Sequence, residues 1–381
     1  MFVFKSCHSI PLPINETTKE AGPHTKFPEC QEGALPQKTR DTSRAIYVRC
    51  FCLAPIRNSC NIGPRRNVGG SAVEDFKDLN MSFTSDENCG SAENGCTKLR
   101  KILECTSWKP KLAFIGGGKM AAALIRGFES AGLVTKNEIA VSVKTVASAG
   151  RWKQLGYANV YTSNELLVRA HGQGIVFLSV KPEARMAMYA ELNRTAFSNT
   201  PVIISIMNGV DVKTLEKELA ANGYTERGVV RLIPNLPVSV CSGASIMCFS
   251  ACLKEENIEL IKCIMQYVGI CAVVSEKSFD AAAAVAGCGP AFIFIAIEAL
   301  SDGGVLGGLD RATAIKLSAH TVMGTARMLL EANEHPGVLK DDVCSAGGST
   351  IYGVKELEKS GFRSALIEAV YASAKRSAGQ M

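Results

Sequence analysis

Two short glycine-rich segments carry residue types that bind anions through the protein backbone. The first, Gly116-Gly-Gly-Lys-Met120, follows the apolar run Leu112–Ile115. The second, Gly347-Gly-Ser-Thr350, comes just before a helical pattern that starts at Ile351. Glycine lets a charged group approach the backbone closely, and the free N–H groups at the start of a helix attract negative charge. Both segments therefore predict anion sites.

The first segment has the spacing of a dinucleotide-binding turn. Gly116, Gly118 and Ala121 fit G-x-G-x-x-A, between a strand-like run and a helical pattern over 120–131. The first glycine permits a tight turn, the second admits a pyrophosphate, and the small third residue lets helix and strand pack. The alternative is an ordinary glycine turn, but the strand-turn-helix context is the one that the mechanism requires. The residues predicted here to bind the cofactor are Ile115, Gly116, Gly117, Gly118, Lys119 and Met120.

The residues after the second predicted strand favour NADPH over NADH. That strand, Ile139–Val143, includes Ser142 and is followed by Lys144 and Thr145, with Arg151 beyond. The acid that NAD-selective sites place here is missing. A hydroxyl group beside cations suits the 2′-phosphate of NADPH, although Lys144 as a plain solvated loop residue is the alternative. NADH is kept as the second cofactor.

Composition excludes several classes of function. The chain has 381 residues and a net charge of +6, with no basic stripe interleaved with aromatics, so we expect no nucleic-acid partner. Its 15 cysteines form no C-x-x-C pairs, which argues against disulfides and against a metal site and indicates a reducing compartment. Residues 281–300 could imitate a membrane span, but Gly287-Cys-Gly-Pro290 interrupts them. We therefore expect two buried helices and no membrane partner.

Three parts follow one another along the chain. Residues 1–110 hold 8 of the 14 prolines and little periodicity, and we expect them to be largely disordered. In residues 111–276 short apolar strands alternate with helical patterns, which predicts an α/β fold with a doubly wound, mostly parallel sheet. Residues 277–381 have helical patterns alone and are rich in alanine and glycine, so we expect them to pack against a second copy. The N-terminal part lacks a convincing transit peptide, which favours the cytoplasm, with the mitochondrion as the alternative.

The predicted elements are as follows. The strands are Leu112–Ile115, Ile139–Val143, Asn159–Tyr161, Ile175–Val180, Val202–Ile206 and Val229–Ile233. The helices of the second part are Met120–Ala131, Asn164–Ala170, Val212–Leu219 and Glu255–Tyr267. The helices of the third part are Phe279–Ala286, Pro290–Leu300 (ended by Gly303-Gly304), Arg311–Glu331, Thr350–Lys359 and Phe362–Lys375.

Several motifs resemble one enzyme family in the same order along the chain. They are Gly116-Gly-Gly-Lys-Met120, Val180-Lys-Pro182, Ile233-Pro-Asn-Leu-Pro237, Cys288-Gly-Pro-Ala, Ile297-Glu-Ala-Leu-Ser-Asp-Gly-Gly304, His335-Pro-Gly-Val-Leu-Lys-Asp341, Gly347-Gly-Ser-Thr-Ile351 and Gly361-Phe-Arg-Ser-Ala-Leu-Ile-Glu-Ala-Val370. Together, across 111–377, they are similar to the pyrroline-5-carboxylate reductases. The resemblance departs from the family pattern at Ala346, Cys288 and Met207-Asn208.

The resemblance implies reduction of 1-pyrroline-5-carboxylate to proline, the last step of proline biosynthesis. It implies a Rossmann-type NADP-binding domain over 111–276, a helical dimerisation and substrate domain over 277–381, and a homodimer that often assembles into a decamer. It also implies that Ser142 and Asn164 lie near the adenosine end of the cofactor. Residues implied on the nicotinamide side are Ser179, Val180, Lys181, Pro182, Asn208 and Gly209.

The substrate is expected at the second glycine-rich segment. Gly347, Gly348, Ser349 and Thr350 would hold the carboxylate of this small molecule, and by resemblance the Thr350 hydroxyl hydrogen-bonds the ring nitrogen. The alternative is that Ser349 or Thr350 merely N-caps the following helix. Two other functions remain open: a β-hydroxyacid or imine reductase of the same plan, and a non-catalytic NADPH-binding sensor or scaffold.

Overall fold

The computed structural model describes residues 97–104, 106–225 and 227–380. Most of the segment that we expected to be disordered, 1–110, lies outside these residues. Inside it, helix α1 (Lys98–Leu103) buries Leu99 and Leu103 in the hydrophobic core. Folded structure therefore begins before Lys111, the residue at which we expected it to start.

Eight strands form one sheet within the described residues. They are β1 (Leu112–Ile115), β2 (Ile139–Ser142), β3 (Asn159–Tyr161), β4 (Ile175–Leu178), β5 (Val202–Ser205), β6 (Val229–Ile233), β7 (Gly243–Phe249) and β8 (Gly269–Val273). Their order is β3-β2-β1-β4-β5-β6-β7-β8, and the first six are parallel. β7 runs antiparallel to β6, and β8 is parallel to β7. The six predicted strands and the mostly parallel sheet are confirmed, whereas β7 and β8 were not predicted.

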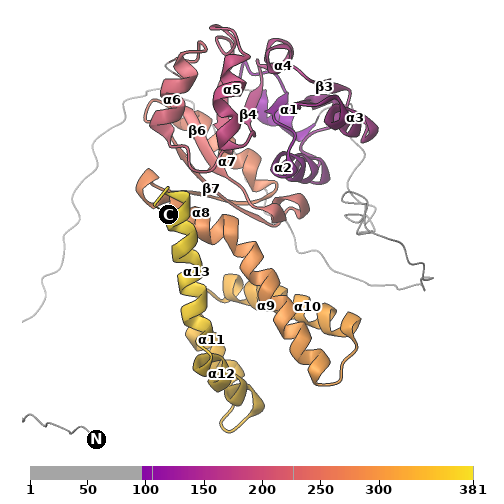
Figure 1. The fold of residues 1–381 in the computed structure, drawn as a ribbon, viewed down its shortest axis with the longest axis vertical. Coiled ribbons are helices and arrows are strands. Elements are labelled where there is room, and N and C mark those ends of the chain that lie inside the picture. Colours follow the sequence, from indigo (N-terminus) through magenta and orange to yellow (C-terminus); the bar gives the residue numbers. More distant parts are fainter. Residues whose placement is uncertain (1–96, 105, 226, 381) are drawn as a thin grey trace, which may run out of the picture. The chain divides into compact units, whose positions relative to one another are not determined.

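Helices cover both faces of the sheet (Figure 1). On one face, α2 (Lys119–Ser130), α3 (Val146–Gln154) and α7 (Glu255–Gln266) enclose a core in which Phe114 and Phe177 stack with ring centres 4.6 Å apart. The opposite face is covered by α4 (Asn164–His171), α5 (Arg185–Ala190) and α6 (Val212–Ala220). The sheet is therefore doubly wound, as predicted. Helices α3 and α5 were not predicted from the sequence.

Helices alone follow the sheet. They are α8 (Phe279–Ala283), a π-helical turn (Ala284–Cys288), α9 (Gly289–Leu306), α10 (Arg311–Ala332), α11 (Pro336–Val343), α12 (Ser349–Lys359) and α13 (Phe362–Ser377). Helix α9 packs along α10, and α13 packs along α8. The predicted helices are confirmed, and α11 is an addition to them.

The prediction that Gly303-Gly304 ends a helix is wrong, because α9 continues to Leu306. A Cβ on Gly304 would lie 3.2 Å from Leu309 Cδ1 and 3.4 Å from Ala314 Cβ. This glycine therefore gives room to the chain that leads into α10. The helix ends instead at Gly307, followed by Gly308 in the left-handed region at φ +99°.

The predicted burial of residues 281–300 is wrong for the single chain. Helical structure over 276–306 is long and apolar enough to cross a membrane by length and composition, yet only 11% of its most apolar window is buried. Within α9, Ser301 is buried, while Phe294 is 64% and Ile295 65% exposed. An apolar surface of this kind is characteristic of a face that another molecule covers.

Candidate active site

The first glycine-rich turn lies where the strand order reverses between β1 and β4. In doubly wound sheets, ligands bind outside the carboxyl ends of the strands at this point. Gly116 has φ +105°, and its N–H donates to the carbonyl oxygen of Ser142 at 3.0 Å. A Cβ on Gly116 would lie 2.7 Å from the carbonyl oxygen of Ser179. The turn therefore requires glycine here on both conformational and steric grounds.

Gly118 leaves an open approach to the start of α2. It is the N-cap residue and has no side chain to bind the first amides, and the first turn of α2 contains no acid. A Cβ placed on Gly118 would meet no atom within 4 Å. The N–H groups of Lys119 and Met120 have no partner inside the helix, because the first amides of any helix lack one. This arrangement fits a pyrophosphate.

Gly117 has a separate packing role. A Cβ there would lie 2.5 Å from Nε1 of Trp152 on α3, and the same indole N–H donates to the carbonyl oxygen of Gly117 at 3.3 Å. Trp152 is buried. The indole thus packs against the turn, a contact that was not predicted from the sequence.

The expected adenosine end forms a chain of hydrogen bonds. The hydroxyl of Ser142 donates to Oδ1 of Asn164 at 2.7 Å, and Nδ2 of Asn164 donates to Glu191 at 2.6 Å. Ser142 is only 1% exposed. Its hydroxyl therefore orients Asn164 and does not face the solvent. Glu191 had no signal in the sequence.

Cationic groups lie around the start of α3. Thr145 is its N-cap and accepts from the N–H of Ser148 at 3.1 Å, and Nη2 of Arg151 donates to the Ser148 hydroxyl at 2.8 Å. Lys144 is exposed immediately before the cap. A helix N-terminus with two cations suits a dianionic group such as a phosphate monoester.

The expected nicotinamide side consists of the segments that follow β4 and β5. The Ser179 hydroxyl is 2.6 Å from the carbonyl oxygen of Gly116 and 3.0 Å from that of Ile115, so it ties β4 to the glycine turn. Beyond Val180, Lys181 is exposed and precedes the 3-10 turn Pro182–Ala184. Asn208 and Gly209, with φ +72° at the glycine, are exposed in the loop after β5. The predicted cofactor residues thus gather at the carboxyl ends of β1, β2, β4 and β5 and at the start of α4.

The second glycine-rich turn ends at an uncapped helix start. Gly347 has φ +68°, and Gly348 is the N-cap of α12 without any side-chain cap. Ser349 and Thr350 are the first two helical residues, and both are exposed. The alternative in which Ser349 or Thr350 caps this helix is therefore wrong, and their amides are free of partners inside α12.

Ser345 shapes this turn and was missed from the sequence. The N–H of Gly348 donates to the carbonyl oxygen of Ser345 at 3.0 Å. A Cβ on Gly348 would lie 2.3 Å from the Ser345 hydroxyl oxygen, so any larger residue here would have to displace that hydroxyl. Among the described residues, no hydrogen bond joins this turn to the cofactor residues at the sheet.

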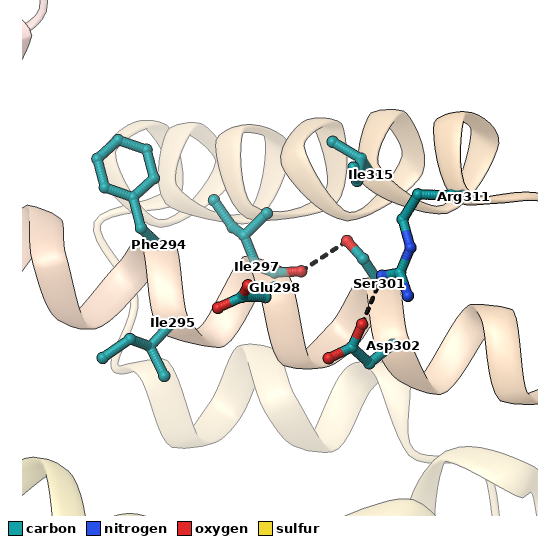
Figure 2. A pocket seen from close by; sticks show the side chains of 8 residues that line it. All are labelled: Phe294, Ile295, Ile297, Glu298, Ser301, Asp302, Arg311 and Ile315. Atoms are coloured by element: carbon teal, nitrogen blue, oxygen red, sulfur yellow. Dashed lines mark hydrogen bonds and ion pairs between the residues drawn. The ribbon is translucent and has the colours of Figure 1, made fainter. Parts of the chain in front are cut away.

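A hollow of about 590 Å³ lies away from these predicted residues, between α9 and α10 (Figure 2). Phe294, Ile295, Ile297 and Ile315 make much of its wall apolar. Of its polar side chains, Ser301 donates to the carbonyl of Ile297 and Arg311 pairs with Asp302, and the carboxylate of Glu298 completes the lining. Within the part of the chain described, no group of three or more His, Cys, Asp or Glu side chains could hold a metal ion.

Comparisons with known proteins match both halves. A family model described as pyrroline-5-carboxylate reductase dimerisation matches residues 276–380, and one described as NADP oxidoreductase coenzyme F420-dependent matches residues 111–209. The pyrroline-5-carboxylate reductase of Arabidopsis thaliana is 38% identical over 277 residues, which are 73% of this chain and 98% of that protein. The Pisum sativum enzyme is 37% identical over 277 residues, with the same two coverages.

A solved structure extends the likeness to three dimensions. The pyrroline carboxylate reductase of Plasmodium falciparum, with NADP bound, aligns with a TM-score of 0.63 at 29% identity over 71% of this chain and 97% of that one. The aligned length, the order of motifs and the doubly wound sheet followed by helices agree with one another. This chain belongs to the pyrroline-5-carboxylate reductase family.

Proposed function

We propose that this protein reduces 1-pyrroline-5-carboxylate to L-proline with NADPH. The observation that carries the proposal is the pair of open, glycine-formed helix starts, one at Gly118 and one at Gly348. One fits a pyrophosphate and the other a carboxylate. When bound, NADPH supplies a hydride to the imine carbon of the substrate.

The protein needs little acid–base machinery for this reaction. A protonated cyclic imine is already electrophilic, so the main tasks are orientation and a hold on the carboxylate. The amides of Gly348, Ser349 and Thr350 would hold the carboxylate, and the Thr350 hydroxyl would hydrogen-bond the ring nitrogen. Lys181 is assigned to the cofactor loop and not to catalysis. Bound NADP in a related structure and the cationic start of α3 support NADPH as the reductant.

We further propose that the enzyme is a homodimer that assembles into larger oligomers, with a decamer as the expected form. The exposed apolar side chains of α9 and the match to a dimerisation family model support this. Because the two turns share no hydrogen bond within one described chain, we propose that α12 of one copy serves the cofactor turn of the other.

The test uses the full chain with Thr350→Ala and Thr350→Ser. We expect Thr350→Ala to lower kcat by at least about tenfold with little change in NADPH affinity, and Thr350→Ser to retain most activity, since the hydroxyl remains. NADPH oxidation with pyrroline-5-carboxylate is the assay. Activity surviving in Thr350→Ala would return Thr350 to a structural role. No oxidation by the parent despite NADPH binding would favour the sensor or another imine substrate.

Mixing two defective variants tests the shared site. Thr350→Ala and Gly118→Ala chains, unfolded together and refolded as a mixture, should recover part of the parent activity, because mixed dimers then contain one site with both turns intact. Each variant refolded alone is the control. A mixture no more active than its components would contradict a site formed by two copies.

A further inference from the structure

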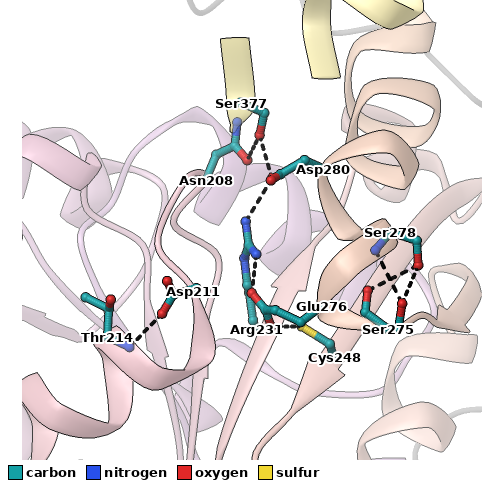
Figure 3. A network of polar contacts seen from close by, with 10 residues as sticks. All are labelled: Asn208, Asp211, Thr214, Arg231, Cys248, Ser275, Glu276, Ser278, Asp280 and Ser377. Atoms are coloured by element: carbon teal, nitrogen blue, oxygen red, sulfur yellow. Dashed lines mark hydrogen bonds and ion pairs between the residues drawn. The ribbon is translucent and has the colours of Figure 1, made fainter. Parts of the chain in front are cut away.

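A buried arginine joins the sheet to the start of the helical part (Figure 3). Arg231 of β6 is 3% exposed, and its Nη1 donates to Glu276 at 2.6 Å while its Nη2 donates to Asp280 at 3.2 Å. Its guanidinium carbon lies 3.9 Å from the ring centre of Phe279. A buried cation strongly requires its carboxylate partners, so Arg231 fixes the position of Asp280 on α8.

The other oxygen of Glu276 is held by Cys248 on β7. The thiol sulfur lies 2.9 Å from Oε2 of Glu276. Burial raises the pKa of the Cys248 thiol, and the nearby carboxylate of Glu276 raises it further, so the thiol stays protonated and donates. Cys248 on β7 is the register partner of Arg231 on β6. The two carboxylate oxygens of Glu276 are therefore held by two neighbouring residues of the same sheet.

Asp280 reaches the last residue of α13. The hydroxyl oxygen of Ser377 lies 2.9 Å from Oδ1 of Asp280 and 3.0 Å from Oδ1 of Asn208. The hydroxyl has one proton, and a carboxylate is the stronger acceptor, so Ser377 donates to Asp280. With its amide turned by 180°, Asn208 donates from Nδ2 to Ser377, so the Ser377 hydroxyl donates one hydrogen bond and accepts another.

The same end of α13 also lies near Gly209. A Cβ on Gly209 would lie 3.5 Å from the carbonyl oxygen of Ser377. The loop after β5 is thus in contact, through Asn208, with a residue that lies 169 positions further along the chain. Asn208 is otherwise exposed. Ser377 therefore links this loop to Asp280 on α8.

We infer that Ser377 is a positioning residue for the cofactor. It holds the Asn208-Gly209 loop in the conformation that binds the nicotinamide side of NADPH, and it acts through Asn208. The rigid end of the contact is the Arg231–Asp280 pair, and the adaptable end is the loop. This inference rests on the proposed function in one respect, the assignment of that loop to the cofactor.

The test measures NADPH binding by the full chain, with nicotinamide fluorescence as the readout. Ser377→Ala should raise the Kd for NADPH about 3- to 10-fold, the value of one hydrogen bond. Ser377→Thr keeps the hydroxyl and should stay within about twofold of the parent. Ser364→Ala, an exposed serine on the same helix, is the matched control and should leave the Kd unchanged.

A double-variant cycle separates positioning from simple stabilisation. In an Asn208→Ala background, Ser377→Ala should add no further loss of NADPH affinity, because the contact is already absent. The KM for pyrroline-5-carboxylate at saturating NADPH should not change. If Ser377→Ala does not fold, Asn208→Ala removes the same contact from the exposed side and should raise the Kd by a similar factor.

Three results would overturn the inference: an unchanged Kd in Ser377→Ala, an equal rise in Ser364→Ala, or additive losses in the double variant. Turnover is not needed for this readout. A parent that binds NADPH but does not reduce the substrate would sink the proposed function and leave the Ser377 test intact. A parent that binds no NADPH would refute both the proposed function and the role of Ser377.

Discussion

Gly118→Ala should separate cofactor binding from folding. At Gly118 the backbone has φ −79° and a Cβ would meet no atom within 4 Å, so alanine fits without strain. The methyl group would nevertheless stand at the open start of α2, where the pyrophosphate must approach the amides. We expect NADPH affinity to fall by at least about tenfold, the loss of one or more charge-assisted hydrogen bonds. The unfolding free energy should change by less than about 1 kcal/mol.

Gly116→Ala is the contrasting variant. Its Cβ would lie 2.7, 2.8 and 2.9 Å from backbone atoms of Ser179 and Val180, at a φ of +105°. Holding alanine in that conformation costs about 1–3 kcal/mol, and overpacking adds about 1–3 kcal/mol. This variant should therefore lose both stability and NADPH binding, whereas Gly118→Ala should lose binding alone.

Two measurements on each protein decide the matter. Urea unfolding gives the free energy of unfolding, and titration of NADPH fluorescence gives the Kd. An affinity in Gly118→Ala equal to that of the parent would refute the reasoning, because it would mean that the pyrophosphate does not lie at the start of α2. An unperturbed Gly116→Ala would refute the steric argument at the turn.

Two further predictions concern the cofactor phosphate and pH. Arg151→Ala should raise the KM for NADPH about 5-fold or more and leave that for NADH unchanged, because only NADPH carries a 2′-phosphate; equal effects on both cofactors in steady-state kinetics would contradict this. Burial raises the pKa of Glu129 above its ordinary 4.5, an effect only partly offset by the hydrogen bond from Tyr157 and by Lys136. A carboxyl with a raised pKa contributes stability at low pH that is lost as the pH rises through its folded value, so Glu129→Gln should gain on the parent as the pH rises above 4.5. Urea unfolding across pH measures the difference, and a constant difference would show that Glu129 is not the responsible group.

The alternation of strands and helices was readable because each of the first five strands is a short, mostly apolar run followed by a crossover to a parallel strand. β7 breaks that rule. It turns back antiparallel to β6 with only the 3-10 turn Leu236–Val240 between them, so a reading based on parallel units had no place for it. β8 is an edge strand with an exposed Ile270 and lacks the continuous burial of the central strands β1, β2, β4, β5 and β6. A local sequence pattern indicates the burial and the period of a strand, but not the direction in which the strand pairs with its neighbour.

The same distinction explains what the sequence revealed of the site. Residues at the carboxyl ends of parallel strands must meet, so the grouping of Gly116, Ser179 and Gly209 could be anticipated. Trp152 supports Gly117 from 35 residues away, and Glu191 reaches Asn164 from 27 residues away. Neither contact leaves a trace in local spacing, because tertiary packing alone creates it.

The π-helical turn Ala284–Cys288 sets the angular phase between α8 and α9. Its wider winding accompanies a hydrogen bond from Nδ2 of Asn235 to the carbonyl of Ala286 at 3.0 Å. Each residue of an α-helix advances the chain by about 100°. Removing one residue here would rotate the apolar side of α9 by that angle, away from α10 and from any second copy. Length in this turn is therefore a stricter requirement than the identity of its side chains, and related enzymes should tolerate substitutions there far more readily than single-residue deletions.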